Sequence, residues 1–219
     1  LIGSLALSFS VVFIVLIIIG FIVAALATRA PGALAGSIAP ILGAGFYLWT
    51  RFAGEFAFRV AVSSDGIRLR HGLLETKART VPPGRVQAVG ISQPLLWRFK
   101  DWWRIQVNIA GYGETETTGT VLYPAATREE VAYLLSLVLP DPRPLPVLHA
   151  AMGGIGSDEE FTTSPRRARW VDPLTWRRTA FRITDTAILL RNGRLWRHLA
   201  VVPHERTQSL GSTQGPLER

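Results

Sequence analysis

Val81 to Arg98 reads VPPGRVQAVGISQPLLWR, and Val202 to Arg219 reads VPHERTQSLGSTQGPLER. A shift of 121 residues aligns the two stretches without a gap. The positions that are identical in both are, in the first stretch, Val81, Pro82, Arg85, Gln87, Gly90, Gln93, Leu96 and Arg98. The same shift pairs Leu69, Arg70 and Gly72 with Leu190, Arg191 and Gly193. One unbroken register over about thirty positions, with a period that suits a small domain, indicates a duplicated domain.

The second copy ends at Arg219, whereas the first continues for about forty residues beyond Arg98. The sequence also begins with Leu1 rather than Met. Both observations lead us to expect that the chain is a fragment of a longer protein, with the second copy truncated.

Charge is distributed unevenly along the chain. The net charge is +8, from 24 basic and 16 acidic residues, yet residues 1–28 carry no charge at all. A basic part beside an apolar start favours attraction to anionic lipid headgroups over attraction to nucleic acid. The absence of Cys excludes a disulfide framework and a thiolate metal site.

The apolar start predicts a transmembrane helix over residues 1–28, because about 20 apolar residues suffice to span a bilayer core. Residues 32–50 predict a second helix, in which the spacing of Gly32 and Gly36 would allow close packing on the first. A re-entrant or interfacial segment is the alternative for this second stretch. The arginines that follow residue 50 place the remainder of the chain in the cytoplasm by the positive-inside rule.

The pattern changes after this predicted hairpin. Apolar residues alternate with polar ones in several short runs between residues 55 and 123, which predicts six or seven antiparallel strands. A helix should follow, because Thr127 and Glu130 have the spacing of a capping box. Its apolar face is formed by Val131, Leu134, Leu135 and Val138.

Strands followed by one amphipathic helix are typical of the pleckstrin-homology (PH) fold. The segment from Gly72 through VPPGRVQ (81–87) to QPLLWR (93–98) resembles the bacterial PH-like domain family of membrane proteins. The resemblance implies an α+β membrane protein, in which a transmembrane helical hairpin precedes tandem PH-like β-sandwich domains. We expect the hairpin at residues 1–50, the first domain at 55–140, a linker at 141–175 and half of the second domain at 176–219.

Within the linker, residues 140–146 (PDPRPLP) predict a stiff extended spacer. The Gly-rich and then acidic stretch 149–164 predicts a mobile loop.

Two basic clusters are candidate binding sites for lipid headgroups or an acidic partner. The first is Arg68, Arg70, Lys77 and Arg79, which alternate on neighbouring strands; a merely solvated strand face is the alternative. The second is Arg166, Arg167, Arg169 and Trp170, followed by Trp176, Arg177 and Arg178. Arginine beside tryptophan suits a headgroup interface. The alternative is an internal clamp, with the tryptophans between domains and the arginines paired with Asp158, Glu159 and Glu160.

No catalytic constellation is evident. The four His are scattered without ligand spacing, no Ser or Thr lies in a nucleophile-elbow context, and Gly111-Tyr112-Gly113 lacks the context of a phosphate loop. We therefore expect a non-enzymatic module without a cofactor or metal, at the inner membrane of a bacterium. Its partners would be anionic lipid headgroups or an acidic partner. A scaffold subunit of an export or envelope-stress complex, binding another membrane protein, is the alternative, and nucleic acid is not expected.

Overall fold

A computed structural model of the chain describes residues 14–20, 22–23, 42–47, 49–50, 53, 56, 58–63, 66–73, 77–109, 120–157 and 161–207. The chain divides into two compact units. The first comprises residues 1–59 and 70–78, and the second comprises residues 60–69 and 79–219.

The first unit contains the apolar start of the chain, and here the expected fold class is wrong. Among the described residues, no helix combines the length and the apolar character needed to cross a membrane. Among the described residues of this range, helix is found chiefly at residues 14–20 and 42–47. The predicted transmembrane hairpin is corrected accordingly. Much of the range that it covered, including Gly32 and Gly36, lies outside the described residues.

A three-stranded sheet has the order β1-β2-β3, where β1 is Arg59–Ser63, β2 is Gly66–His71 and β3 is Lys77–Val81. The alternation that predicted these strands is visible in β2, whose Ile67 and Leu69 are buried while Arg68 and Arg70 are exposed. Burial alternates along β2 because successive side chains of a strand point to opposite faces of the sheet.

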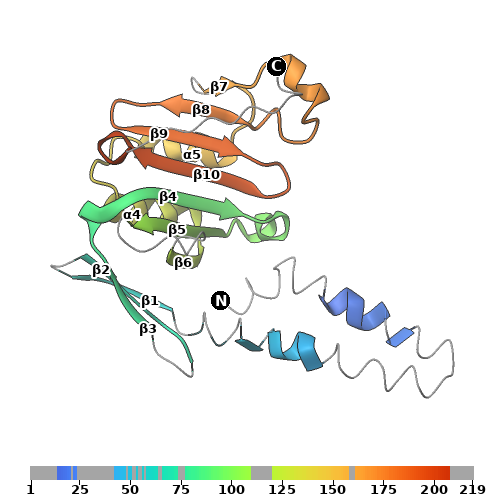
Figure 1. Cartoon of the computed structure of the whole chain (residues 1–219). Helices are drawn as coiled ribbons and strands as arrows, with labels where there is room; N and C mark the ends of the chain where they lie inside the picture. Colours follow the sequence, from blue (N-terminus) through green and yellow to red (C-terminus); the bar gives the residue numbers. More distant parts are fainter. Residues whose placement is uncertain are drawn as a thin grey trace. The chain divides into compact units, whose positions relative to one another are not determined.

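A seven-stranded sheet has the order β6-β5-β4-β10-β9-β8-β7 (Figure 1). Its strands from the first copy are β4 (Val86–Gln93), β5 (Trp103–Ile109) and β6 (Thr120–Ala126). From the second copy and the preceding linker come β7 (Thr162–Thr163), β8 (Ala180–Ile183), β9 (Ala187–Asn192) and β10 (Arg197–Pro203). The two copies meet where β10 pairs antiparallel with β4, with Val201 opposite Val89 and Leu199 opposite Ile91. This pairing satisfies the backbone groups of what would otherwise be two exposed strand edges.

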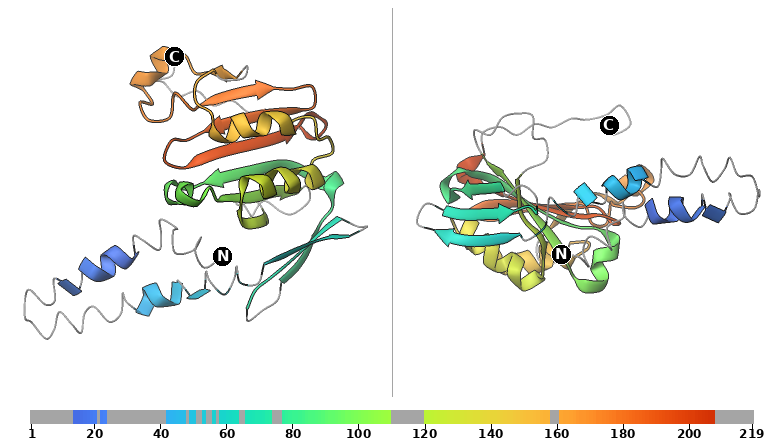
Figure 2. Two further views of the ribbon diagram at one scale, coloured as in Figure 1. Left: turned by 180° about the vertical axis from the view of Figure 1, so that it is seen from behind. Right: turned by 90° about the horizontal axis from the view of Figure 1, so that it is seen from below.

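Two helices lie on the same face of this sheet (Figure 2, left). Helix α4 (Arg128–Val138) contacts β5 and β6, and α5 (Leu145–Gly153) contacts β9 and β10. The capping box that predicted α4 is confirmed: Thr127 accepts from the Glu130 backbone N–H, and the Glu130 carboxylate accepts from the Thr127 N–H. The four residues of its expected apolar face are buried.

Helix α5 corrects the predictions for the linker. Leu148, Ala151 and Met152 are buried in a segment expected to be a spacer and then a loop. The prolines were misleading, because Pro is tolerated in the first turn of a helix, where no intrahelical N–H bond is lost.

Two buried arginines cap the C-terminal end of α5 by donating hydrogen bonds to its carbonyls. Arg178 donates to the carbonyls of Ala151, Met152 and Gly154, and Arg191 donates to those of Ala150 and Gly156.

The duplication seen in the sequence is reproduced element by element. The bounds of β9 are those of β2 shifted by 121 residues, and the 3-10 turns η1 (Pro83–Arg85) and η5 (His204–Arg206) have the same relation. Gly72 and Gly193, identical in the alignment, both have positive φ, at 112° and 75°. A side chain at Gly193 would collide with the Trp196 carbonyl, so this turn requires glycine in the second copy.

Equivalent residues of the two copies differ in burial. Leu69 of β2 is 1% exposed, whereas its counterpart Leu190 of β9 is 47% exposed. On the opposite face of these strands the difference in burial is the reverse: Arg68 and Arg70 of β2 are exposed, whereas their counterparts Leu189 and Arg191 of β9 are buried. Leu189 and Arg191 lie on the side of the sheet that α5 covers. The second copy therefore packs α5 against the face that the first copy leaves exposed.

Candidate functional site

A cavity of about 410 Å³ collects six arginines from separate parts of the second unit. They are Arg98 of the 3-10 helix η2 (Leu95–Lys100), Arg169 of the 3-10 helix η4 (Arg166–Trp170), Arg177 and Arg178 of the turn before β8, Arg194 of the β9–β10 turn, and Arg197 of β10. The rest of the lining is Ile155, Pro173, Leu174 and Trp176. We call this site the arginine cavity. Among the described residues that line it, none is acidic.

Arg178 is the most deeply buried member, at 3% exposed. Its two terminal nitrogens are committed to the end of α5, at 2.8 Å from the Gly154 oxygen and 2.8 Å from the Met152 oxygen. Its Nε is buried and has no acceptor among the described residues. Such an unsatisfied donor costs about 1–3 kcal/mol, more when the group is charged, unless a ligand supplies the acceptor.

Arg98 and Arg197 connect the two copies at this cavity. Arg98, from the first copy, donates through Nη2 to the carbonyls of Arg194 and Leu195 in the second. Its Nε is also buried without an acceptor in the described part of the chain. In the other direction, Arg197 donates to the Gln93 Oε1 at 3.2 Å.

Gln93 also belongs to a second cluster of polar residues, which is centred on Asp101. The Gln93 amide donates to Asp101 Oδ1 at 3.0 Å, and the Trp103 indole donates to the same oxygen at 2.9 Å. Arg128 of α4 donates to both carboxylate oxygens. These bonds, Arg128 foremost and then those from Trp103 and Gln93, outweigh burial and lower the pKa of Asp101. Asp101 is therefore neutralised by Arg128 and does not line the cavity.

The arginine cavity is strongly electropositive. Burial first, and then the charges of Arg197, Arg191 and Arg98, lower the pKa of Arg178 to about 9. Burial and the charges of Arg197 and Arg194 likewise lower the pKa of Arg98. Within the described ranges, no carboxylate forms an ion pair with any of the six arginines. Guanidinium remains protonated in proteins, so Arg178 and Arg98 carry their charge in a partly desolvated site beside other arginines.

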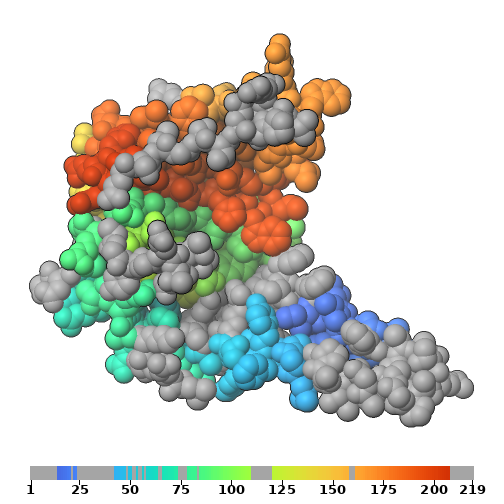
Figure 3. Space-filling model, in the orientation of Figure 1, coloured from blue at the N-terminus to red at the C-terminus, as the bar shows by residue number. Residues whose placement is uncertain are grey.

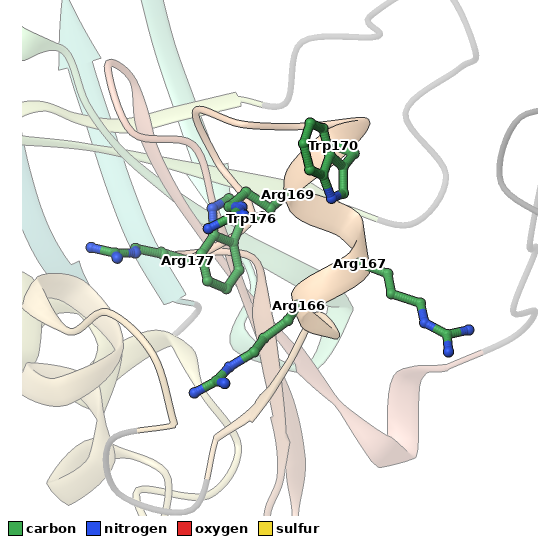
Figure 4. A pocket seen from close by; sticks show the side chains of 6 residues that line it. All are labelled: Arg166, Arg167, Arg169, Trp170, Trp176 and Arg177. Carbon is green, nitrogen blue, oxygen red and sulfur yellow. The ribbon is translucent and has the colours of Figure 1, made fainter.

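A second hollow, of about 520 Å³, adjoins the first around η4 and is lined by Arg166, Arg167, Arg169, Trp170, Trp176 and Arg177 (Figure 4). Arg169, Trp176 and Arg177 line both hollows, which makes them neighbours on one surface. Two arginines lie over indole rings: Arg169 at 5.7 Å from the Trp170 centroid and Arg177 at 5.5 Å from that of Trp176. These distances are within the range of cation–π attraction.

The structure brings together only some of the predicted residues of the second cluster. Arg169 joins the arginine cavity, while Figure 4 shows Arg167 pointing away from Trp176 and Arg177. Trp170 is 83% exposed, which contradicts the alternative in which it packs between domains. The acidic residues 158–160 of that alternative lie outside the described residues.

The first predicted cluster is divided between two faces. Arg68 and Arg70 share the exposed face of β2. Arg79 is two residues from buried Val81 in β3, so the two side chains lie on the same face of that strand. Its Nη1 donates to Thr120 Oγ1 of β6 at 2.6 Å. The side chain of Lys77 lies outside the description. We therefore find no support for a single surface formed by these four residues.

Sequence reasoning did not assign Arg98, Arg194 and Arg197 to a site. Arg98 is the last residue of the repeated QPLLWR stretch, but the repeat indicates no partner for it. These arginines approach one another only because β10 pairs with β4, and that pairing leaves no local pattern in the sequence.

Three comparisons with known proteins test which family the chain belongs to. The family model of the bacterial PH domain matches residues 2–141 and again residues 148–219. No curated protein matches the chain. No solved structure matches it either. The match supports the tandem PH-like repeat, but it does not support the expectation of a family of membrane proteins. The chain belongs to the bacterial PH domain family.

Proposed function

We propose that the chain is a binding module whose arginine cavity takes up a phosphate-type anion, carried by a lipid headgroup or by an acidic partner. PH domains are generally non-catalytic binding modules, and this family membership indicates an interaction role. The observation that carries the proposal is that six arginines, and no acidic residue of the part of the chain that the structure describes, line one cavity. Arg98 and Arg178 add partly or fully buried positive charge to this lining.

The chemistry of the cavity selects the ligand class. Guanidinium groups present planar forks of N–H donors that match the oxygens of phosphate. Several forks converging on one cavity favour a group with several charged oxygens over a single carboxylate. Exposure increases from Arg178 at the base to Arg169, Arg177 and Arg194, which are exposed. An anion can therefore enter from solvent and approach the buried charge of Arg178.

The test is calorimetric titration of the chain with inorganic pyrophosphate. We expect the double variant Arg177→Gln/Arg194→Gln to bind about 10–100-fold more weakly, since a hydrogen bond to a charged group contributes roughly 1.5–3 kcal/mol. Both side chains are exposed, so the fold should tolerate the change.

The matched control is Arg85→Gln/Arg206→Gln, which removes the same charge from exposed, equivalent positions of η1 and η5. It should bind pyrophosphate as the unaltered chain does. Equal weakening in both double variants would mean that net charge alone attracts the anion, and the proposal would fail. It would fail equally if the unaltered chain showed no binding.

A further inference from the structure

Apolar side chains surround the arginine cavity and the adjoining hollow. Ile155 and Leu174 line the cavity itself and are 55% and 57% exposed. Trp170 lines the hollow around η4, which shares Arg169, Trp176 and Arg177 with the cavity. We call Ile155, Trp170 and Leu174 the apolar rim. The orange segment that contains η4 projects from the surface in Figure 3.

A tryptophan exposed to this extent is unusual on a protein surface, where single apolar residues are common but clustered ones mark interaction sites. Here the three rim residues lie beside arginines rather than beside other polar types. The question is which partner offers negative charge and apolar material at the same place.

We infer that the apolar rim and the arginine cavity together dock the chain on an anionic phospholipid surface, with a headgroup phosphate in the cavity and the rim at the boundary between headgroups and acyl chains. The inference rests on the proposed function, because the cavity must bind phosphate. A bilayer supplies both chemistries at fixed depths, phosphate in the headgroup layer and hydrocarbon about 5–10 Å below it.

Side-chain preferences agree with this arrangement. Tryptophan is enriched at the membrane interface, where one edge of the indole is apolar and its N–H remains hydrated. Arginines near an anionic surface are attracted to it by their charge. An acidic peptide would satisfy the arginines but would leave Trp170 and Leu174 in water, so the observations favour the lipid surface.

The experiment is flotation of the full chain with vesicles of phosphatidylcholine alone or of phosphatidylcholine with phosphatidylglycerol. The readout is the binding gained with phosphatidylglycerol, because the apolar residues before residue 50 can associate with both vesicle types and cancel in the difference. The rim variant is Trp170→Ser/Leu174→Ser, and the control is Tyr133→Ser, an exposed aromatic residue of α4 that lines neither hollow. All variants are also titrated with pyrophosphate.

We expect the rim variant to lose at least about tenfold in phosphatidylglycerol-dependent binding while its affinity for pyrophosphate is unchanged. Tyr133→Ser should retain both. If the chain binds pyrophosphate but gains nothing from phosphatidylglycerol, or if the rim variant floats like the unaltered chain, the inference is overturned and the proposed function stands. Binding of an acidic peptide such as polyglutamate in place of vesicles would identify a protein partner and would also overturn it. Loss of pyrophosphate binding in the unaltered chain would overturn both.

Discussion

At the scale of the residue, His198 of β10 offers a probe of the arginine cavity. Partial burial and, next, the charge of Arg178 lower the pKa of His198 below its usual 6.5. The side chain as a whole is exposed, so its desolvation is incomplete and the imidazole is accessible to titration. The charge of Arg178 therefore couples this histidine to the most deeply buried arginine of the cavity.

We expect pyrophosphate to raise the pKa of His198. An anion beside Arg178 offsets the positive charge that disfavours the imidazolium, so the protonated form becomes easier to reach. Following the His198 ring protons by NMR through a pH titration, with and without pyrophosphate, measures this directly. The Arg177→Gln/Arg194→Gln variant should show a smaller change at the same concentration of pyrophosphate. A pKa that stays constant or falls in the unaltered chain would place the anion elsewhere.

Asp101 is the second informative residue, because it combines a left-handed backbone with four side-chain hydrogen bonds. Its φ is 49°, a conformation that Asp and Asn tolerate better than other non-glycine residues. The lowered pKa of Asp101 means that its ionised form stabilises the fold above the ordinary value near 3.8, and that this contribution is lost as the pH falls through the folded-state pKa.

Asp101→Ala should reduce the free energy of unfolding by about 2–3 kcal/mol, because it strands the indole N–H of buried Trp103 and adds backbone strain. Asp101→Asn keeps an acceptor oxygen and the tolerated backbone, so it should cost less than half as much. Urea denaturation followed by tryptophan fluorescence gives both values. Equal costs would show that charge, rather than the Trp103 bond and the backbone, dominates at this position.

At the scale of the element, the sequence predicted most of what local patterns determine. The strands of the first copy followed from the period of two, and α4 followed from Thr127 and Glu130. Helix α5 was missed because the prolines of 140–146 resemble a spacer, whereas its stability depends on burial of Leu148 and Met152 and on the Arg178 and Arg191 caps. Those partners are distant in sequence, so no local sequence pattern predicts them.

The duplicated strands allow one substitution to be compared in two environments. We expect Leu69→Ala in β2 to cost about 2–5 kcal/mol, since it leaves a cavity around a residue that is almost fully buried. The equivalent Leu190→Ala in β9 should cost less than about 1 kcal/mol, because nearly half of that side chain is already in water.

Denaturant unfolding of the two variants under identical conditions checks the difference. The substitution is the same in chemistry and the positions are equivalent in the repeat, so each variant is the control of the other. Similar costs would mean that the exposed face of β9 is covered in solution.

At the scale of the whole molecule, the arginine cavity belongs to neither copy alone. Arg98 comes from the first copy and Arg194 and Arg197 from the second, and the β4–β10 pairing brings them together. The sequence revealed the duplication but not the pairing of β4 with β10. A repeat indicates that two units are alike, but not which of their strand edges pair. The cavity could therefore not be predicted, although Arg169, Arg177 and Arg178 belong to a basic cluster that is visible in the sequence.

Because both copies contribute to the cavity, an anion should stabilise their junction. We expect pyrophosphate at about 100 times its dissociation constant to add roughly 2.7 kcal/mol to the free energy of unfolding, and so to raise the melting temperature. Arg98→Gln should lose most of this increase, whereas Arg85→Gln should keep it. Thermal melts with sodium chloride at matched ionic strength separate site binding from screening. A rise that sodium chloride reproduces would contradict a specific site.

The central claim, that an anion binds among the arginines of the two copies, is tested most directly by crystals of the chain soaked with tungstate, a phosphate-like anion that scatters anomalously. We expect an anomalous peak within hydrogen-bond distance of Arg98 and Arg178, and the loss of that peak in Arg177→Gln/Arg194→Gln crystals. A peak confined to Arg68 and Arg70 of β2, or no peak in the arginine cavity, would contradict it.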